Sequence, residues 1–403
     1  MKSSTLRFAF FTAASFLLIN LSSCDVFQIG DSKTQGVTSD EIVIGSHTAL
    51  SGMVAYWGIG ITNAIKLVFE QVNSKGGVHG RKIRFIAEDS HFDIPITIQK
   101  ANKLIEQDKI FMMLAGMGAD QNNAVLEKQL AKNIPNVFPI TSALSMIKPH
   151  HKLKFTFVST FYDQTRAVVS FFVKRRNSKS VCVLYQDNEF GNEVLSGVND
   201  QLKSMGMTTT ASISHSADSI QFTEEISELK NRNCDVIILG TIVRDTIGAV
   251  RIARKMGWKV DIVGASTACN DVVIKLGGEP MEGFFSVNAV EWVDEDMAFG
   301  KAKQFLDAYR AKYGMPADQP AQMGYICADI VVQALEKAGR NLTVDSFVES
   351  MESIDSYRSP FNGPKRSFEP GRHQATNISE LMRIKNGKWR SPINERLFLK
   401  LDY

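Results

Sequence analysis

Apolar and polar positions along the chain follow two patterns that alternate. Short apolar runs at Ile42–Thr48 and Ile110–Ala115 are each followed by a longer stretch, Tyr56–Asn73 and Asp120–Lys132, with apolar residues at helical spacing. Short apolar runs between turn residues predict strands, and apolar positions repeated every three or four residues predict helices with one buried face. This alternation predicts a mostly parallel sheet covered by helices.

The same alternation starts again in the middle of the chain. Strands are predicted at Lys179–Tyr185 and Asp235–Gly240, with helical patterns after each. A further strand is predicted at Thr208–Ser212, and helices are predicted at Asp296–Tyr313 and Gln319–Ala338. The C-terminal stretch Phe368–Trp389 contains Asn386-Gly387, a pair that favours a tight hairpin turn. We therefore predict an α/β protein of two lobes, each a mostly parallel sheet flanked by helices. Ligands of such sheets bind at the carboxyl ends of the strands, here in the cleft between the lobes.

The N-terminus carries a different pattern. Lys2 and Arg7 precede the apolar run Phe8–Leu21, which is shorter than the roughly 20 residues that span a bilayer. The run is typical of a secretory signal peptide. It ends in Leu21-Ser22-Ser23-Cys24, which resembles a bacterial lipobox, in which the cysteine is lipidated. The alternative is an ordinary cleavage site with a chance cysteine.

The lipobox implies an exported protein that is lipid-anchored through Cys24 to a bacterial membrane, in the periplasm or at the cell surface. Residues 1–24 would form the lipoprotein signal peptide. The polar stretch 25–38 is predicted to be a flexible tether. The sequence leaves open whether the anchor lies in the inner or the outer membrane.

Composition excludes several classes of function. The formal net charge is +3 and no long basic tract occurs, so we expect no nucleic-acid partner. The chain has no Walker loop, no GxSxG and no HExxH motif, so we do not expect an enzyme. The absence of CxxC pairs and histidine clusters predicts no metal site, and no cofactor is expected.

Four cysteines remain once Cys24 is assigned to the lipid: Cys182, Cys234, Cys269 and Cys327. An exported protein meets an oxidising compartment, and four cysteines allow three pairings. The sequence leaves these pairings open. Cys182 and Cys234 lie in or beside apolar runs, a position typical of small buried thiols.

Several segments, in chain order, resemble the leucine/isoleucine/valine-binding family of ABC-transporter substrate-binding proteins. They are 42–45 (IVIG), 50–58 (LSGMVAYWG), 73–82 (NSKGGVHGRK), 87–90 (AEDS), 183–191 (VLYQDNEFG) and 363–368 (GPKRSF). The resemblance implies a type I periplasmic-binding-protein fold, in which the chain crosses between the lobes three times. The implied first lobe is 39–157 plus 291–357, and the second is 158–290 plus 358–403. A hinge of this kind closes around a ligand.

The resemblance also implies a function. The protein would capture a small molecule in the cleft and deliver it to an ABC permease in the inner membrane. The implied ligand is similar to a branched-chain amino acid, or is an apolar carboxylate or amide. A ligand-sensing lipoprotein of a signalling system would use the same cleft, and the sequence does not separate the two. We expect a monomer.

The resemblance implies that the loop 115–121 of the first lobe binds the ligand carboxylate. Gly116 and Gly118 allow the backbone to approach closely, and the helix that follows offers its N-terminus to an anion. A plain glycine-rich turn with Asp120 as N-cap is the alternative. The hydroxyl that the family carries near Gly118 is missing here.

Three further first-lobe residues match ligand contacts of the family. Thr141 and Ser142 follow the next strand and would contact the ligand head group, although turn chemistry alone explains such residues. Trp57, in a glycine-flanked loop, would flank the cleft, and burial in the core is its alternative.

From the second lobe, Phe190 matches a tyrosine of the amino-acid binders. Tyr162 and Asp163 lie just past the first crossing and are expected to face the cleft. Asp163 would alternatively cap the helix that follows.

Two departures from the family bear on the ligand. Ser266 stands where the amino-acid binders carry a glutamate for the ligand ammonium, and Ile242 replaces a cleft tyrosine. A buried ammonium without a compensating charge costs several kcal/mol. These changes favour an apolar carboxylate or amide over an amino acid. Other carboxylates that could take over the ammonium are Asp120, Asp163 and Asp245, and Arg244 could serve an anionic ligand.

Overall fold

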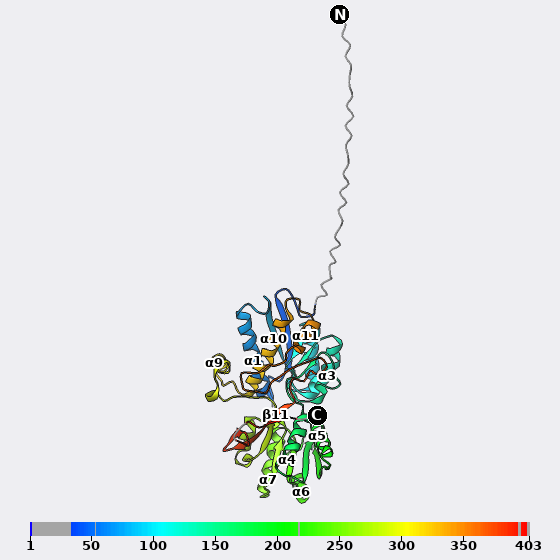
Figure 1. Cartoon of the computed structure of the whole chain (residues 1–403), viewed down its shortest axis with the longest axis vertical. Coiled ribbons are helices and arrows are strands. Elements are labelled where there is room, and N and C mark those ends of the chain that lie inside the picture. The colour runs from blue at the N-terminus through cyan, green and yellow to red at the C-terminus, as the bar shows by residue number, and fades with distance from the viewer. Residues whose placement is uncertain (2–33, 53, 217, 394–395, 401–403) are drawn as a thin grey trace. The chain divides into compact units, whose positions relative to one another are not determined.

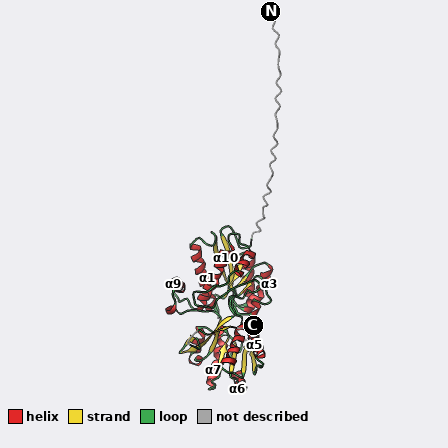
Figure 2. Ribbon diagram, viewed as in Figure 1, coloured by secondary structure: helices red, strands yellow, loops and turns green. Residues whose placement is uncertain are grey.

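The structure, a computed structural model, describes Met1 and residues 34–52, 54–216, 218–393 and 396–400. From residue 34 onward the chain forms two lobes, each built on its own sheet (Figure 1). Helices flank the strands in both lobes (Figure 2). The predicted signal peptide and its Cys24 lie outside the described residues.

The first lobe contains a five-stranded parallel sheet with the order β2-β1-β3-β4-β5. Strand β1 pairs with β2 over its whole length, from Glu41 opposite Lys82 to Thr48 opposite Asp89. Nearly all of β1 is buried, as expected of a central strand covered by helices on both faces. The strands are β1 (Glu41–Thr48), β2 (Lys82–Asp89), β3 (Met112–Leu114), β4 (Asn136–Val137) and β5 (Lys154–Phe155).

Two long helices that are far apart in the chain pack together on this sheet. They are α1 (Ala55–Ser74) and α10 (Gln319–Ala338). A Cβ on Gly324 would lie only 2.5 Å from Ile61 O, so glycine permits the close contact. The remaining helices of the lobe are α2 (Ile94–Glu106), α3 (Ala119–Ala131), α9 (Gly300–Tyr313) and α11 (Val344–Glu352).

The second lobe contains an eight-stranded mixed sheet with the order β12-β11-β10-β9-β8-β6-β7, and β13 also pairs with β11. The strands from β6 to β10 run parallel, while β11 returns antiparallel to β10. The strands are β6 (Val181–Gln186), β7 (Ala211–His215), β8 (Val236–Gly240), β9 (Asp261–Gly264), β10 (Phe285–Asn288), β11 (Ile378–Lys385), β12 (Lys388–Arg390) and β13 (Phe398–Lys400).

The helices of the second lobe bury both faces of this sheet, which gives the lobe two separate apolar clusters. Cys182 and Cys234 form a disulfide that joins β6 to the residues before β8. Cys269 and Cys327 are free and buried. The helices are α4 (Phe161–Arg175), α5 (Glu189–Ser204), α6 (Thr223–Asn231), α7 (Val243–Lys255) and α8 (Asp271–Gly277).

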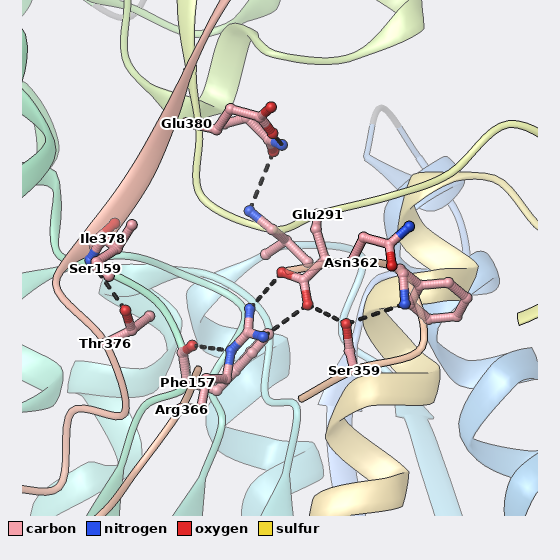
Figure 3. Close-up of polar contacts among 12 residues, drawn as sticks. Phe157, Ser159, Glu291, Ser359, Asn362, Arg366, Thr376, Ile378 and Glu380 are labelled. Atoms are coloured by element: carbon pink, nitrogen blue, oxygen red, sulfur yellow. Dashed lines mark hydrogen bonds and ion pairs between the residues drawn. The ribbon is translucent and has the colours of Figure 1, made fainter. Parts of the chain in front are cut away.

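A buried ion pair joins the three segments that cross between the lobes (Figure 3). Arg366, which is fully buried in the segment that leads to the third crossing, donates both terminal nitrogens to Glu291 of the second crossing, each at 2.7 Å. Its Nε donates to Phe157 O of the first crossing at 2.9 Å. Gly363 makes room for this pair, since a Cβ there would lie 2.0 Å from the Glu291 carboxyl carbon. One arginine therefore joins the first and second crossings to the segment that leads to the third.

Two boundaries differ from those expected from the sequence. Phe361, Phe368 and Ala375 lie in the hydrophobic core of the first lobe, so the chain re-enters the second lobe only near β11 rather than at residue 358. Residues 34–38, expected in the tether, instead bond to the first lobe. Val37 bridges to Ile42 and the Gln35 side chain donates to Ile110 O.

The α/β architecture predicted from the apolar pattern is confirmed, including the hairpin turn at Asn386-Gly387 between β11 and β12. Both turn residues have positive φ, +52° and +65°, as that turn type requires. Of the helices within the described ranges, none has the length and apolar character needed to cross a bilayer.

Candidate functional site

The loop between β3 and α3 presents backbone groups at the carboxyl end of the first sheet. Gly118 has a φ of +93°, and a Cβ there would lie 2.0 Å from Gln121 Oε1, so the loop requires glycine at this position. Gly118 is the N-cap of α3 and supplies no side-chain cap bond. Asp120, the alternative N-cap, lies in the first turn of α3 instead. The helix therefore begins with N–H donors suited to an anion.

Two buried side chains, Asn122 and His47, lie behind this loop, and neither was expected in the site from the sequence. Asn122 Nδ2 donates to Gly116 O at 2.9 Å and to Gly118 O at 2.6 Å. His47 is fully buried, and its ring nitrogens have no hydrogen-bond partner within the described part of the chain. Burial lowers the pKa of His47 to about 4. His47 is thus neutral at physiological pH and adds no charge to this wall.

The loop after β4 carries Thr141 and Ser142. Thr141 Oγ1 accepts from Ala143 N at 3.1 Å, which is the turn role considered as the alternative. Ser142 is 8 % exposed and bonds to α4 of the second lobe. Its Oγ accepts from Gln164 at 3.1 Å, and its carbonyl accepts from Phe161 N at 2.8 Å.

Gln164 brings two of the expected site residues together from opposite lobes. Its Nε2 donates to Ser142 Oγ and to Ser159 O, the latter at 2.9 Å, while its Oε1 accepts from Ser266 N at 3.3 Å. The side chain is fully buried. No sequence signal marked Gln164, because a glutamine in the first turn of a helix is ordinarily solvated.

Three further second-lobe residues expected in the site, Phe190, Tyr162 and Asp163, have different contacts. Phe190 is buried and its ring packs edge-on against Phe161, with 4.5 Å between centroids. Tyr162 instead directs its hydroxyl to Asp200 of α5, to which it donates at 2.7 Å. Asp163 is buried and accepts from Gln374 Nε2 at 3.0 Å, on the third crossing.

Asp163 does not cap α4, because the N-cap is Thr160, whose hydroxyl accepts from Asp163 N. The carboxylate is therefore bonded at the hinge. This contact argues against Asp163 as a partner for a ligand ammonium.

Ile242 is the N-cap residue of α7, and a buried carboxylate lies in the turn that follows it. Asp245 is fully buried, and its Oδ1 accepts from Arg244 Nε at 2.7 Å. Asp245 Oδ2 has no hydrogen-bond partner among the described residues. A buried acceptor without a partner costs free energy unless a donor reaches it. Because Arg244 forms an ion pair with Asp245, it is less suited to bind an anionic ligand.

Trp57 is half-buried in the first turn of α1, beside Tyr56, with 6.1 Å between ring centroids. Tyr56 lines a cavity of about 160 Å³ together with residues of the second lobe and the second crossing, among them Asp271 and Trp292. Burial and the Asp318 carboxylate raise the pKa of Tyr56. No group of three or more His, Cys, Asp or Glu side chains is placed to hold a metal ion in the described residues.

The chain matches known proteins over most of its length. A sequence profile described as periplasmic binding protein matches residues 41–388. The Leu/Ile/Val-binding protein homolog 7 of Brucella abortus (strain 2308) is 22% identical over 331 residues, which cover 79% of this chain and 82% of the relative.

Solved structures share the fold at low identity. A branched chain amino acid ABC transporter protein from Thermus thermophilus, with bound valine, has a TM-score of 0.78 at 15% identity, covering 90% of this chain and 97% of that one. The fatty acid ABC transporter substrate-binding protein from Thermomonospora curvata has a TM-score of 0.77 at 22% identity, covering 91% and 93%. The profile match over residues 41–388 shows that this chain belongs to the periplasmic binding protein family.

Proposed function

We propose that this protein is an extracytoplasmic solute-binding protein that captures a small molecule between its lobes and delivers it to an ABC permease. Family membership supports solute binding outside the cytoplasm. The observation that carries the proposal is the meeting of Ser142 and Ser266, from opposite lobes, at the single side chain of Gln164. The N–H groups at the start of α3 supply the donors for an anionic head group.

The ligand we favour is a small carboxylate or amide with an uncharged apolar tail. Ser266 offers no charge for an ammonium, and Ile242 and Phe190 add apolar surface. Related folds are named for both kinds of cargo, since one neighbour holds valine and another is a fatty acid transporter protein. The fold therefore does not choose between them. Asp245 Oδ2, which has no hydrogen-bond partner among the described residues, favours a ligand with an amide or amine nitrogen. This oxygen is the strongest argument for the alternative that the ligand is an amino acid.

Binding itself is tested by native mass spectrometry and thermal shift on the purified protein with a panel of short aliphatic carboxylates, their amides and branched-chain amino acids. A ligand at 100 times its Kd should add about 2.7 kcal/mol to the free energy of unfolding. A matched Gly118→Val panel identifies ligands that use the α3 loop. Failure of every compound to bind or to stabilise the protein would contradict the proposal.

The lipid anchor on Cys24 is part of the proposal. The disulfide between Cys182 and Cys234 supports an oxidising compartment, where such bonds persist. Cys24→Ser should leave the protein unprocessed or release it from the membrane fraction, whereas Cys269→Ser should not. A Cys24→Ser protein that remains lipidated at mature size would refute the anchor.

A further inference from the structure

Two glutamates of α5 reach across to the first lobe. Asn123 Nδ2, on α3, donates to Glu189 Oε2 at 2.6 Å, and Leu144 N, in the loop after β4, donates to Glu193 Oε2 at 2.8 Å. The glutamates are four residues apart and therefore lie on one face of α5. Figure 1 shows α3 in the first lobe and α5 in the second. This face of α5, with Glu189 and Glu193, thus forms a polar contact between the lobes.

Glu193 is the more deeply placed of the two. Glu193 is only 9 % exposed. Its Oε1 accepts from Tyr162 N, in the first turn of α4, at 2.9 Å. One carboxyl group therefore holds a backbone N–H from each lobe. The bond from Phe161 N to Ser142 O adds a second attachment of the same loop to α4.

We propose that Glu193 is a positioning residue that fastens the loop 139–144 to the second lobe. The loop lies between two strands of the first sheet, yet its bonds at Ser142 and Leu144 run to α4 and α5. The placement of Thr141 and Ser142 in the cleft then depends on both lobes at once. The inference goes beyond solute binding, because it concerns a contact inside the protein and holds for any ligand.

The charges around Glu193 make this fastening sensitive to pH. Burial raises the pKa of Glu193 to about 7, against the two N–H donors, which lower it. The carboxylates of Glu189, on the same helix, and Asp163, on α4, raise it further. The loop 139–147 carries no charged side chain. On its far side, Lys154 of β5 donates to Ser145 O at 2.9 Å. The carboxyl group therefore changes charge near neutral pH while it faces two amide protons.

The test follows those amide protons by ¹H–¹⁵N NMR of the purified protein between pH 5 and 9. The Leu144 and Tyr162 signals should titrate together, with one midpoint near 7 set by Glu193. Glu193→Gln should abolish the titration and speed hydrogen exchange at Leu144 by about tenfold, as expected for one lost hydrogen bond. Asp200→Asn is the matched control, because Asp200 lies on the same helix and bonds to the Tyr162 hydroxyl. It should leave both titrations in place.

Two results would overturn the inference. One is a Leu144 signal that does not move with pH while the Tyr162 signal does, since that would confine the contact to the second lobe. The other is a Glu193→Gln protein that keeps the wild-type titration at Leu144. Both readouts require no ligand, so they stand apart from any failure to find a solute.

Discussion

Two buried glutamates lie where the lobes meet, and their surroundings give them opposite properties. Glu291, on the second crossing, shares its site with Arg366, whereas Glu193, on α5, accepts its hydrogen bonds from two backbone N–H groups. Burial acts to raise the pKa of both. The charge and hydrogen bonds of Arg366 nevertheless hold the pKa of Glu291 below its usual range, while that of Glu193 is raised to about 7. The cation beside Glu291 accounts for the difference, since a nearby opposite charge favours the ionised form of a carboxyl group.

The sites of Glu291 and Glu193 therefore have different roles in the protein. The ion pair at the crossings keeps its charges at every physiological pH and anchors the three chain segments at one point. The contact at Glu193 is held by bonds to a carboxyl group whose pKa is raised to about 7. A hinge needs both a fixed pivot and contacts that can be made and broken.

The largest expected effect comes from breaking the ion pair. Arg366→Met should leave Glu291 buried without a counter-charge, at a cost of about 3–5 kcal/mol in the free energy of unfolding. Chemical denaturation measures this loss. Asp307→Asn, which breaks an exposed pair with Lys303, should cost less than about 1 kcal/mol. Similar losses in the two variants would mean that the buried pair does not hold the crossings together.

The second effect is the pH dependence that Glu193 imposes on stability. Its pKa is higher in the folded protein, about 7, than the ordinary 4.5, so its stabilising contribution is complete below about pH 4.5 and is lost as pH rises through 7. At about 1.4 kcal/mol for each pH unit, the free energy of unfolding should fall by about 3 kcal/mol between pH 4.5 and 8 relative to Glu193→Gln. Unfolding curves measured at several pH values check this. Parallel profiles for wild type and Glu193→Gln would disprove it.

His47 works in the opposite sense. Its pKa is lowered to about 4, so its stabilising contribution is present above the ordinary value of 6.5 and is lost as pH falls towards 4. The comparison with Glu193→Gln cancels this term, since His47 is present in both proteins.

A smaller loss is expected at Gln164, which joins Ser142 of the first lobe to Ser266 of the second. Gln164→Ala leaves Ser266 N and Ser142 Oγ without this partner and should cost about 1–3 kcal/mol. Gln333→Ala, on the exposed face of α10, should change stability by no more than about 0.5 kcal/mol. An equal, small change in both variants would show that water replaces Gln164 without penalty.

The apolar pattern predicted most of the fold, and the departures have local causes. Helix α10 begins and ends at the predicted residues, since Pro320 lies in its first turn and Gly339 follows its last residue. Strand β7 lies at Ala211–His215 rather than the predicted 208–212, because Ile213 is its one large apolar residue and the apolar signal is therefore weak. The predicted helix from residue 296 begins only at Gly300, after a short 3₁₀ turn.

The site was less predictable than the fold. The family resemblance supplied the candidate positions, and the structure places Ser142 and Ser266 at one side chain. The side chain that joins them, Gln164, and the fastening at Glu193 arise from the packing of α4 and α5 against a loop of the other lobe. The disulfide partner of Cys182 likewise depends on which strands are neighbours. Such contacts between distant segments leave no pattern in a single sequence.

We propose that the cleft binds a carboxylate with an apolar tail in preference to an amino acid. Ser266→Glu is the variant that tests this ligand preference, because a carboxylate at this position can pair with an ammonium. Ser216→Glu, at an exposed serine of the same lobe, is the matched control.

Titration calorimetry of ligand-stripped protein with leucine and with hexanoate tests this claim most directly. Wild type should bind hexanoate and bind leucine weakly or not at all, since an unpaired buried ammonium costs several kcal/mol. Ser266→Glu should shift the preference towards leucine, and Ser216→Glu should not. Micromolar or tighter binding of leucine to the wild-type protein would contradict the account and would identify Asp245, with its spare oxygen, as the residue to test next for the ammonium.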